Sequence, residues 1–160
     1  MGASIQHKHI LIRAECKLSP KSHQEKLIET KLDYLIKDIS MTEYLPPKAK
    51  FCTDYNNTGM TAVAGLATSH IALHFFDDAV DEIMTYNGLS MLSLDLYTCG
   101  DLSIHQVQTI LKFVTEYQPQ HVNAVVFDRA KALITPAHTF EFDIKDGVSY
   151  INFVENLKLC

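Results

Sequence analysis

Apolar residues recur along this chain at two different spacings, and these spacings predict where its helices and strands lie. From residue 27 to residue 39 they return every three or four positions, which predicts an amphipathic helix. Residues 22–25, just before it, match a capping box, in which a serine hydroxyl and a glutamate side chain satisfy free backbone amides. A second capping box at residues 103–106 opens another helical pattern, which runs to Tyr117 and ends before Pro119.

Shorter runs of β-branched and aromatic residues predict strands around these two helices. The runs cover residues 9–14, 51–55, 60–66, 69–76, 91–97 and 122–127, and residues 138–144 and 148–154 form a closing hairpin. Residues 56–59 predict a turn, and Pro46-Pro47 predicts a loop. Asp77 or Asp78 is placed to cap a short helix that continues to Tyr86.

Strands joined by tight turns outnumber helices in this order. The pattern favours an α+β fold, in which an antiparallel β-sheet has two main helices packed on one face. With 160 residues, no linker and no low-complexity tract, the chain is expected to form a single domain.

Composition excludes several classes of function. A net charge of −5 and scattered Lys and Arg residues argue against a nucleic-acid surface. No apolar run approaches the roughly 20 residues that span a bilayer, so no membrane contact is expected. The cysteines show no CxxC spacing and no disulfide density, which fits a reducing, cytoplasmic location; they are Cys16, Cys52, Cys99 and Cys160.

The candidate chemistry centres on a serine, a histidine and a cysteine. Ser69 opens a predicted strand, His74 follows five residues later, and Cys99 lies just after another predicted strand. A serine in a strained backbone can attack the carbonyl of the preceding residue, and the resulting ester can eliminate and hydrolyse to a pyruvoyl group. Such a group forms a Schiff base with an amine and acts as an electron sink. These steps require a base and a group that holds the oxyanion.

Strand geometry sets a condition on this chemistry. Residues an odd number of positions apart face opposite sides of a regular strand, as Ser69 and His74 do. The two side chains meet only if the chain bends near Ser69. A strained turn at that point is also what the acyl shift requires.

These segments resemble the prokaryotic S-adenosylmethionine decarboxylases. In that family Glu-Ser-His leads into Ile/Leu-x-Ile-His-x-x-x-Glu, and Phe-Thr-Cys-Gly-Asp follows on a later strand. Residues 68–74 and 97–101 of this chain keep these two frames. Upstream, residues 55–56 and 59–61 match the family's Phe-Asn and Gly-x-Ser at the same distance before the serine.

The resemblance implies a pyruvoyl-dependent decarboxylase that acts on S-adenosylmethionine and serves spermidine synthesis. Cleavage between Thr68 and Ser69 would give a β chain of residues 1–68 and an α chain of residues 69–160. The pyruvoyl cofactor would form from Ser69. By the same analogy the chain is expected to be a homodimer of cleaved protomers, with active sites near the subunit contact.

The resemblance also implies a role for each remaining site residue. His74 would assist the elimination, and Thr61 would hold the oxyanion. Cys99 would return a proton to the substrate α-carbon after carbon dioxide leaves. Tyr55 would stack on adenine, and Asp78 would bind the ribose hydroxyls.

Departures from the family pattern leave alternatives open. Thr68 stands where the family has glutamate, which leaves open an unprocessed, non-catalytic regulatory homologue. Asp78 is shorter than the family's glutamate and the segment after it is longer, so arginine or ornithine remains a possible substrate. If residues 70–78 were helical, His70, His74 and Asp78 would share a face and could bind zinc or iron, but the β-rich flanks favour a strand.

Overall fold

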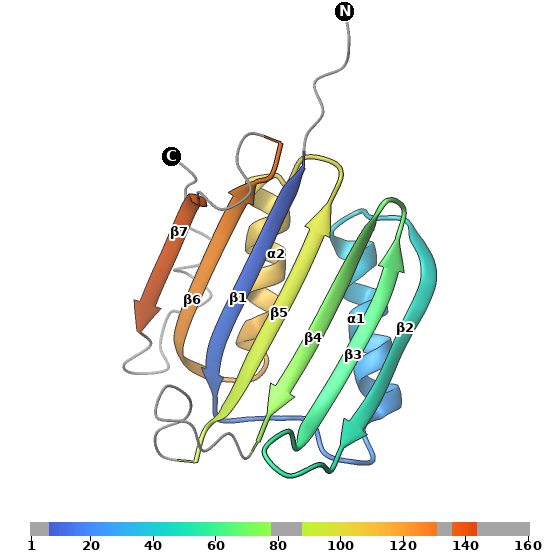
Figure 1. Ribbon diagram of the computed structural model, residues 1–160, viewed down its shortest axis with the longest axis vertical. Helices are drawn as coiled ribbons and strands as arrows, with labels where there is room; N and C mark the ends of the chain where they lie inside the picture. The colour runs from blue at the N-terminus through green and yellow to red at the C-terminus, as the bar shows by residue number, and fades with distance from the viewer. Residues whose placement is uncertain (1–6, 78–87, 131–135, 144–160) are drawn as a thin grey trace, which may run out of the picture.

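One antiparallel sheet, backed on one side by two helices, accounts for the residues described by this computed structural model: 7–77, 88–130 and 136–143. In chain order the elements are β1 (Lys8–Cys16), α1 (Glu25–Asp38), β2 (Glu43–Cys52), β3 (Gly59–Leu66), β4 (Ser69–Phe76), β5 (Ser90–Thr98), α2 (Ile104–Thr115), β6 (Pro119–Asp128) and β7 (Pro136–Asp143). The strands lie in the order β2-β3-β4-β5-β1-β6-β7, and both helices cover the same face (Figure 1). The predicted α+β architecture is confirmed.

Alternating side chains give the sheet a covered face and an open face. Along β4, Ile71, Leu73 and Phe75 are buried, whereas the residues between them are partly or fully exposed. β1, β3, β5 and β6 repeat the alternation. The buried side chains of both helices join the same core; they are Ile28, Leu32, Leu35, Ile36, Val107, Ile110, Leu111, Phe113 and Val114. We call the helix side the covered face and the other side, over which no described element lies, the open face.

The two helices begin differently from one another. At α2 the predicted capping box is present, because Gln106 N donates to Ser103 Oγ over 3.2 Å and Ser103 N donates to Gln106 Oε1 over 2.8 Å. At α1 the predicted capping box is wrong. The N-cap of α1 is Gln24, which makes no side-chain cap and instead closes the preceding turn by accepting a hydrogen bond from Lys21 N at 2.8 Å.

The loop predicted at Pro46-Pro47 is also wrong, because both prolines lie within β2. β2 stands at the edge of the described sheet, and its register with β3 shifts between Leu45 and Lys48. Proline has no N–H to donate, and an edge strand with an irregular register does not need one at every position.

Five strand predictions match β1, β3, β4, β5 and β6 within a few residues, and the first arm of the closing hairpin corresponds to β7. The strand predicted over residues 51–55 is wrong beyond Cys52, where β2 ends. The helix predicted from Asp77 or Asp78 and the second hairpin arm lie outside the described residues. Neither helix in the described part of the chain has the length and hydrophobicity that a membrane span requires.

Gly59 lets β3 start close to the backbone of β4. Its φ is +145°, and a Cβ atom there would lie 1.9 Å from Phe75 O. Gly59→Ala is expected to lower the free energy of unfolding by about 3 kcal/mol, because the β4 backbone would have to move. Gly88→Ala is the matched control: its φ is +72° but nothing lies within 4 Å, so its expected cost is about 1 kcal/mol. Both variants are made in a Ser69→Ala chain, which lacks the serine needed for the predicted cleavage. Urea denaturation measures the free energy of unfolding of each, and equal losses in the two variants would contradict the prediction.

Cys16 lies in the core, and burial raises the pKa of its thiol to about 12 from an ordinary value of 9.0. Between pH 9.0 and about pH 12 the unfolded chain releases a proton that the folded chain keeps. The free energy of unfolding therefore falls as the pH rises through this range. Cys16→Ala is expected to make the free energy of unfolding fall less steeply with pH there. Urea titrations at several pH values test this, and a Cys16→Ala chain whose stability falls as steeply as that of the parent would contradict it.

Candidate active site

Cross-strand pairing arranges the side chains of the open face in rows, and the predicted catalytic residues lie in these rows or next to them. One row contains Thr61, His74, Ser93 and Arg13. The row in the middle contains Val63, Ala72, Asp95 and Leu11. The third row, nearest Ser69, contains Gly65, His70, Tyr97 and His9. Thr61 and His74 therefore lie at one end of the open face, and its other end leads to Ser69 at the start of β4 and Cys99 just after β5.

Thr61 and His74 lie opposite each other on β3 and β4. The distance between Thr61 Oγ1 and His74 Nδ1 is 3.1 Å, and both residues are half-buried. A hydroxyl can stabilise a negative oxygen atom, and an imidazole beside it can move a proton. We refer to these residues as the Thr61–His74 pair.

Ser69 and Cys99 lie together at the other end of β4. The Cys99 backbone N–H donates to Ser69 Oγ over 3.4 Å, and the Cys99 residue is exposed. A nucleophilic hydroxyl and a thiol that can donate a proton are thus neighbours, although they are 30 residues apart in the chain. We refer to them as the Ser69–Cys99 pair.

The peptide bond before Ser69 lies in a tight turn. Leu66 pairs with Ser69, so only Ala67 and Thr68 remain to reverse the chain. The φ of Thr68 is +59°, in the left-handed region that a β-branched residue rarely adopts. The bend expected next to Ser69 is therefore present, and it strains the backbone at the bond predicted to be cleaved.

This bend does not bring Ser69 to His74 within one chain. The two residues are five positions apart in the regular strand β4. At about 3.3 Å per residue, their Cα atoms are about 17 Å apart. The Thr61–His74 pair and the Ser69–Cys99 pair are therefore two separate halves of the predicted site.

Of the two residues predicted to bind substrate, the structure describes only Tyr55. Tyr55 lies in the turn between β2 and β3, and it is 86% exposed, so its ring is free to stack on a planar group. Asp78 lies outside the described residues. The alternative in which residues 70–78 form a metal-binding helix is wrong, because residues 69–76 are the strand β4.

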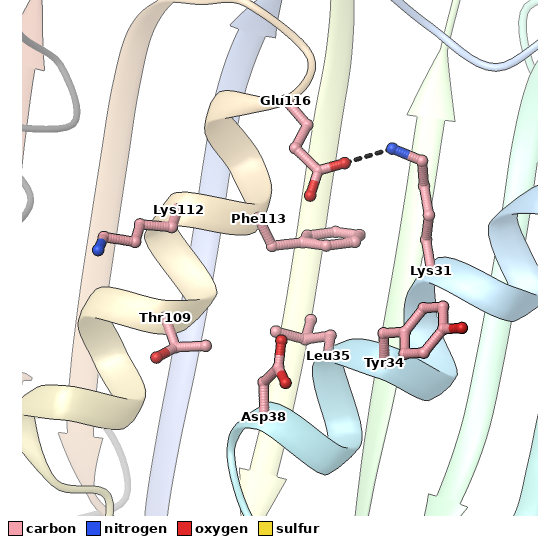
Figure 2. A pocket seen from close by; sticks show the side chains of 8 residues that line it. All are labelled: Lys31, Tyr34, Leu35, Asp38, Thr109, Lys112, Phe113 and Glu116. Atoms are coloured by element: carbon pink, nitrogen blue, oxygen red, sulfur yellow. Dashed lines mark hydrogen bonds and ion pairs between the residues drawn. The ribbon is translucent and has the colours of Figure 1, made fainter.

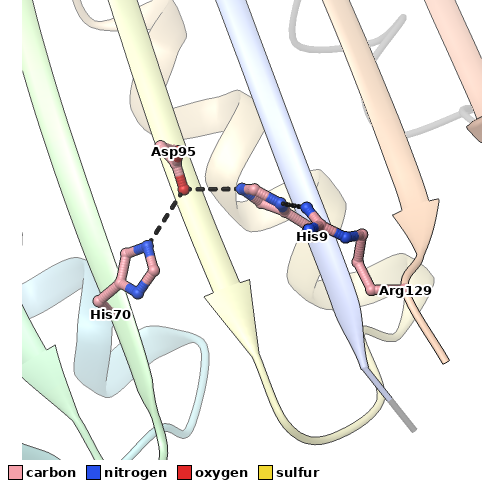
Figure 3. Close-up of polar contacts among 4 residues, drawn as sticks. All are labelled: His9, His70, Asp95 and Arg129. Carbon is pink, nitrogen blue, oxygen red and sulfur yellow. Dashed lines mark hydrogen bonds and ion pairs between the residues drawn. The ribbon is translucent and has the colours of Figure 1, made fainter. Parts of the chain in front are cut away.

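Sequence analysis missed a polar network that crosses the open face beside the Ser69–Cys99 pair (Figure 3). Asp95 Oδ1 lies 2.8 Å from His9 Nε2 and 3.5 Å from His70 Nε2. Arg129 Nη1 lies 2.8 Å from His9 Nδ1. A guanidinium can only donate, so His9 Nδ1 accepts and the His9 proton sits on Nε2, facing Asp95. The sequence signal was weak, because the four side chains come from four separate segments.

A groove lies between α1 and α2, away from the open face (Figure 2). It has a volume of about 400 Å³ and lies against the helices; its lining residues are Lys31, Tyr34, Leu35, Asp38, Thr109, Lys112, Phe113 and Glu116. An ion pair between Lys31 and Glu116 crosses it. None of the predicted catalytic residues lines this groove, so we assign the chemistry to the open face.

Comparisons with known proteins show the family and the fold. A family model described as S-adenosylmethionine decarboxylase matches residues 9–130. The crystal structure of the adenosylmethionine decarboxylase from Aquifex aeolicus VF5 is similar in fold, with a TM-score of 0.54 and 21% identity over 79% of this chain and 92% of that chain. A search of curated proteins found no match. Because the family model matches most of the chain, this protein belongs to the S-adenosylmethionine decarboxylase family of carboxy-lyases.

Proposed function

We propose that this chain decarboxylates S-adenosylmethionine by means of a pyruvoyl group made from its own Ser69, and that the product serves spermidine synthesis. The observation that carries the proposal is the left-handed Thr68 directly before Ser69, in a turn where the Ser69 hydroxyl is held by the Cys99 amide. A strained peptide bond and a held nucleophile are what an acyl shift needs.

The residues around Ser69 fit the formation of this group. Attack of Ser69 Oγ on the carbonyl carbon of Thr68 would form an ester, break the amide bond and free the nitrogen of residue 69. Thr68 in place of a glutamate does not oppose this step, because the attacked atom belongs to the backbone. Once present, a pyruvoyl group supplies an electrophilic carbonyl that takes up an amine and accepts the electron pair left by departing carbon dioxide.

The other residues would act on protons and on the oxyanion. Thr61 would donate its hydroxyl to the oxyanion of the acyl shift, and His74 would take the α-proton of residue 69 in the elimination. Cys99, exposed beside Ser69, would give its thiol proton to the substrate α-carbon. Tyr55 would stack on the adenine ring. The first two roles require the Thr61–His74 pair to reach a Ser69 that lies about 17 Å away.

A two-fold dimer through the open faces would meet this requirement. The helices cover only the other face, and the open face exposes apolar Leu11 (37%) and Val63 (48%) in its middle row. A two-fold axis that runs between the two sheets and crosses the strands near Ala72 would set the Ser69 end of β4 opposite His74 of the partner subunit. Face-to-face sheets lie about 10 Å apart, a distance that side chains span from both sides. We therefore propose a homodimer with two composite sites.

Cleavage at Ser69 is the direct test. Denaturing mass analysis of the purified protein is expected to show two fragments, residues 1–68 and 69–160. Ser69→Ala should leave the chain whole, because it has no hydroxyl to attack Thr68. Cys99→Ala should cleave normally but release carbon dioxide from S-adenosylmethionine about 100-fold more slowly, because a proton donor is lost.

Ser19→Ala, in the segment between β1 and α1, is the control for these variants and should behave as the parent in both assays. A parent chain that stays whole and releases no carbon dioxide from S-adenosylmethionine would contradict the proposal.

The composite site predicts that His74 acts on the other subunit. The His74→Ala chain, expressed alone, is expected to stay whole. Co-expressed with a tagged Ser69→Ala chain it should be cleaved, because its Ser69 then faces the intact His74 of the partner subunit. Mass analysis of the purified mixed dimer measures this. Co-expression of two differently tagged His74→Ala chains is the control, and mixed dimers without any cleavage would exclude a site shared between subunits.

A further inference from the structure

Two opposite charges lie at opposite ends of the open face, on the neighbouring strands β1 and β6. Glu15 is the last residue of β1 that faces the open side. Arg129 directly follows β6, and its backbone N donates to His7 O over 2.6 Å. Leu11, in the middle row, pairs with Val125. Because the two strands are antiparallel, Glu15 and Arg129 lie four residues from that row in opposite directions.

The Glu15 carboxylate is half-buried, and no hydrogen bond or ion pair joins it to another described residue. It borders a hollow of about 440 Å³ on the open face, whose other lining residues are Arg13, His121 and Asn123. Arg13 and His121 each have an interaction of their own. A charge that is partly removed from water needs a partner of opposite sign. The hollow therefore suits a cation that enters it from above the sheet.

The Arg129 guanidinium has donors to spare. It reaches from the end of β6 to His9, where Nη1 lies 2.8 Å from Nδ1 (Figure 3). Its Nε is buried and has no hydrogen-bond partner in the described part of the chain. A guanidinium has five N–H donors, stays charged at any physiological pH and matches a carboxylate in geometry. A carboxylate is therefore the acceptor that suits this end of the open face.

We propose that Glu15 of each subunit forms an ion pair with Arg129 of the partner subunit. The inference rests on the homodimer proposed above. The two-fold axis of that dimer follows the middle row, so rotation about it turns each end of one open face toward the opposite end of the other. Arg129 of the partner subunit then faces the hollow beside Glu15, one strand away. Symmetry makes two such ion pairs.

Residues on different strands support the same axis. The axis sets the Ser69 end of β4 opposite His74 of the partner subunit, and the same rotation brings Glu15 to Arg129 of the partner subunit on β1 and β6. Glu15 and Arg129 have no part in the proposed chemistry. One axis thus completes the catalytic groups and pairs two charges that the single chain leaves apart.

The middle row meets its own copy at this axis. Leu11 and Val63, both exposed in the single chain, then bury apolar surface against apolar surface. Asp95 also faces its copy, but each Asp95 carboxylate is already held within its own subunit, 2.8 Å from His9 Nε2 and 3.5 Å from His70 Nε2. The contacts on the axis therefore agree with the ion pairs at its two sides.

Charge reversal tests the ion pairs without the decarboxylation reaction. The variants are made in a Ser69→Ala chain, and size-exclusion chromatography with light scattering measures their assembly. Glu15→Arg alone and Arg129→Glu alone each set like charges together at both sites, so the dissociation constant of each homodimer should rise about 100-fold. Mixed in equal amounts, the two chains should form a heterodimer about as tight as the parent, because each site then holds one positive and one negative side chain.

Asp38→Arg and Lys21→Glu are the matched controls. Both reverse an exposed charge in or next to α1, away from the open face. Each should give a homodimer as tight as the parent, and their mixture should show no preference for heterodimers. The Glu15→Arg and Arg129→Glu chains are also co-expressed with different tags, so that a chain that is unstable alone is still tested with its partner.

Single variants that dimerise as tightly as the parent, or a mixture of the two without preferred heterodimers, would overturn the ion pairs. A monomeric parent would overturn the homodimer and the ion pairs together. Failure of the proposed function gives a different result. In that case the charge preference is present, but the parent chain with Ser69 shows neither cleavage nor carbon dioxide release, so the ion pairs stand and only the chemistry is lost.

Discussion

The register of β4 between β3 and β5 is the constraint on which the rest of this structure depends. Pairing of Leu66 with Ser69 leaves two residues for the turn and forces Thr68 to a φ of +59°. The same register sets Thr61 against His74. A slip by one residue would send every side chain of β4 to the opposite face, which would expose its core residues and bury the candidate base His74.

Stability and chemistry are divided between the two faces of the sheet. Leu73 and Phe75 are among the buried residues of β4 on the helix side, and each such side chain contributes on the order of 1.5–3 kcal/mol. The alternate positions of β4 face away from this core and carry His70 and His74. The fold therefore presents polar, reactive groups on a broad surface that a second sheet can cover, and the proposed dimer couples assembly to completion of the site.

The local capping signals in the sequence predicted one of the two helix starts correctly. The capping box of α2 needs only Ser103 and Gln106, and it forms as expected. The expectation for Pro46-Pro47 failed, because whether a proline is tolerated depends on the position of its strand in the sheet, which is a property of the whole fold. At α1 the first helical residue is Glu25, so the box at Ser22 had no helix end to cap.

The sequence by itself determined which reactive groups the chain has, how its strands alternate and which family it resembles. Only the tertiary structure decided which of these groups meet. β1 inserts between β5 and β6, which brings His9 to Asp95 and His7 to Tyr97, whereas the regular strand β4 keeps Ser69 apart from His74 despite their closeness in the chain. The physical reason is that contacts on a sheet follow strand order and register, which depend on how distant segments pair, whereas spacing along one strand fixes only face and distance.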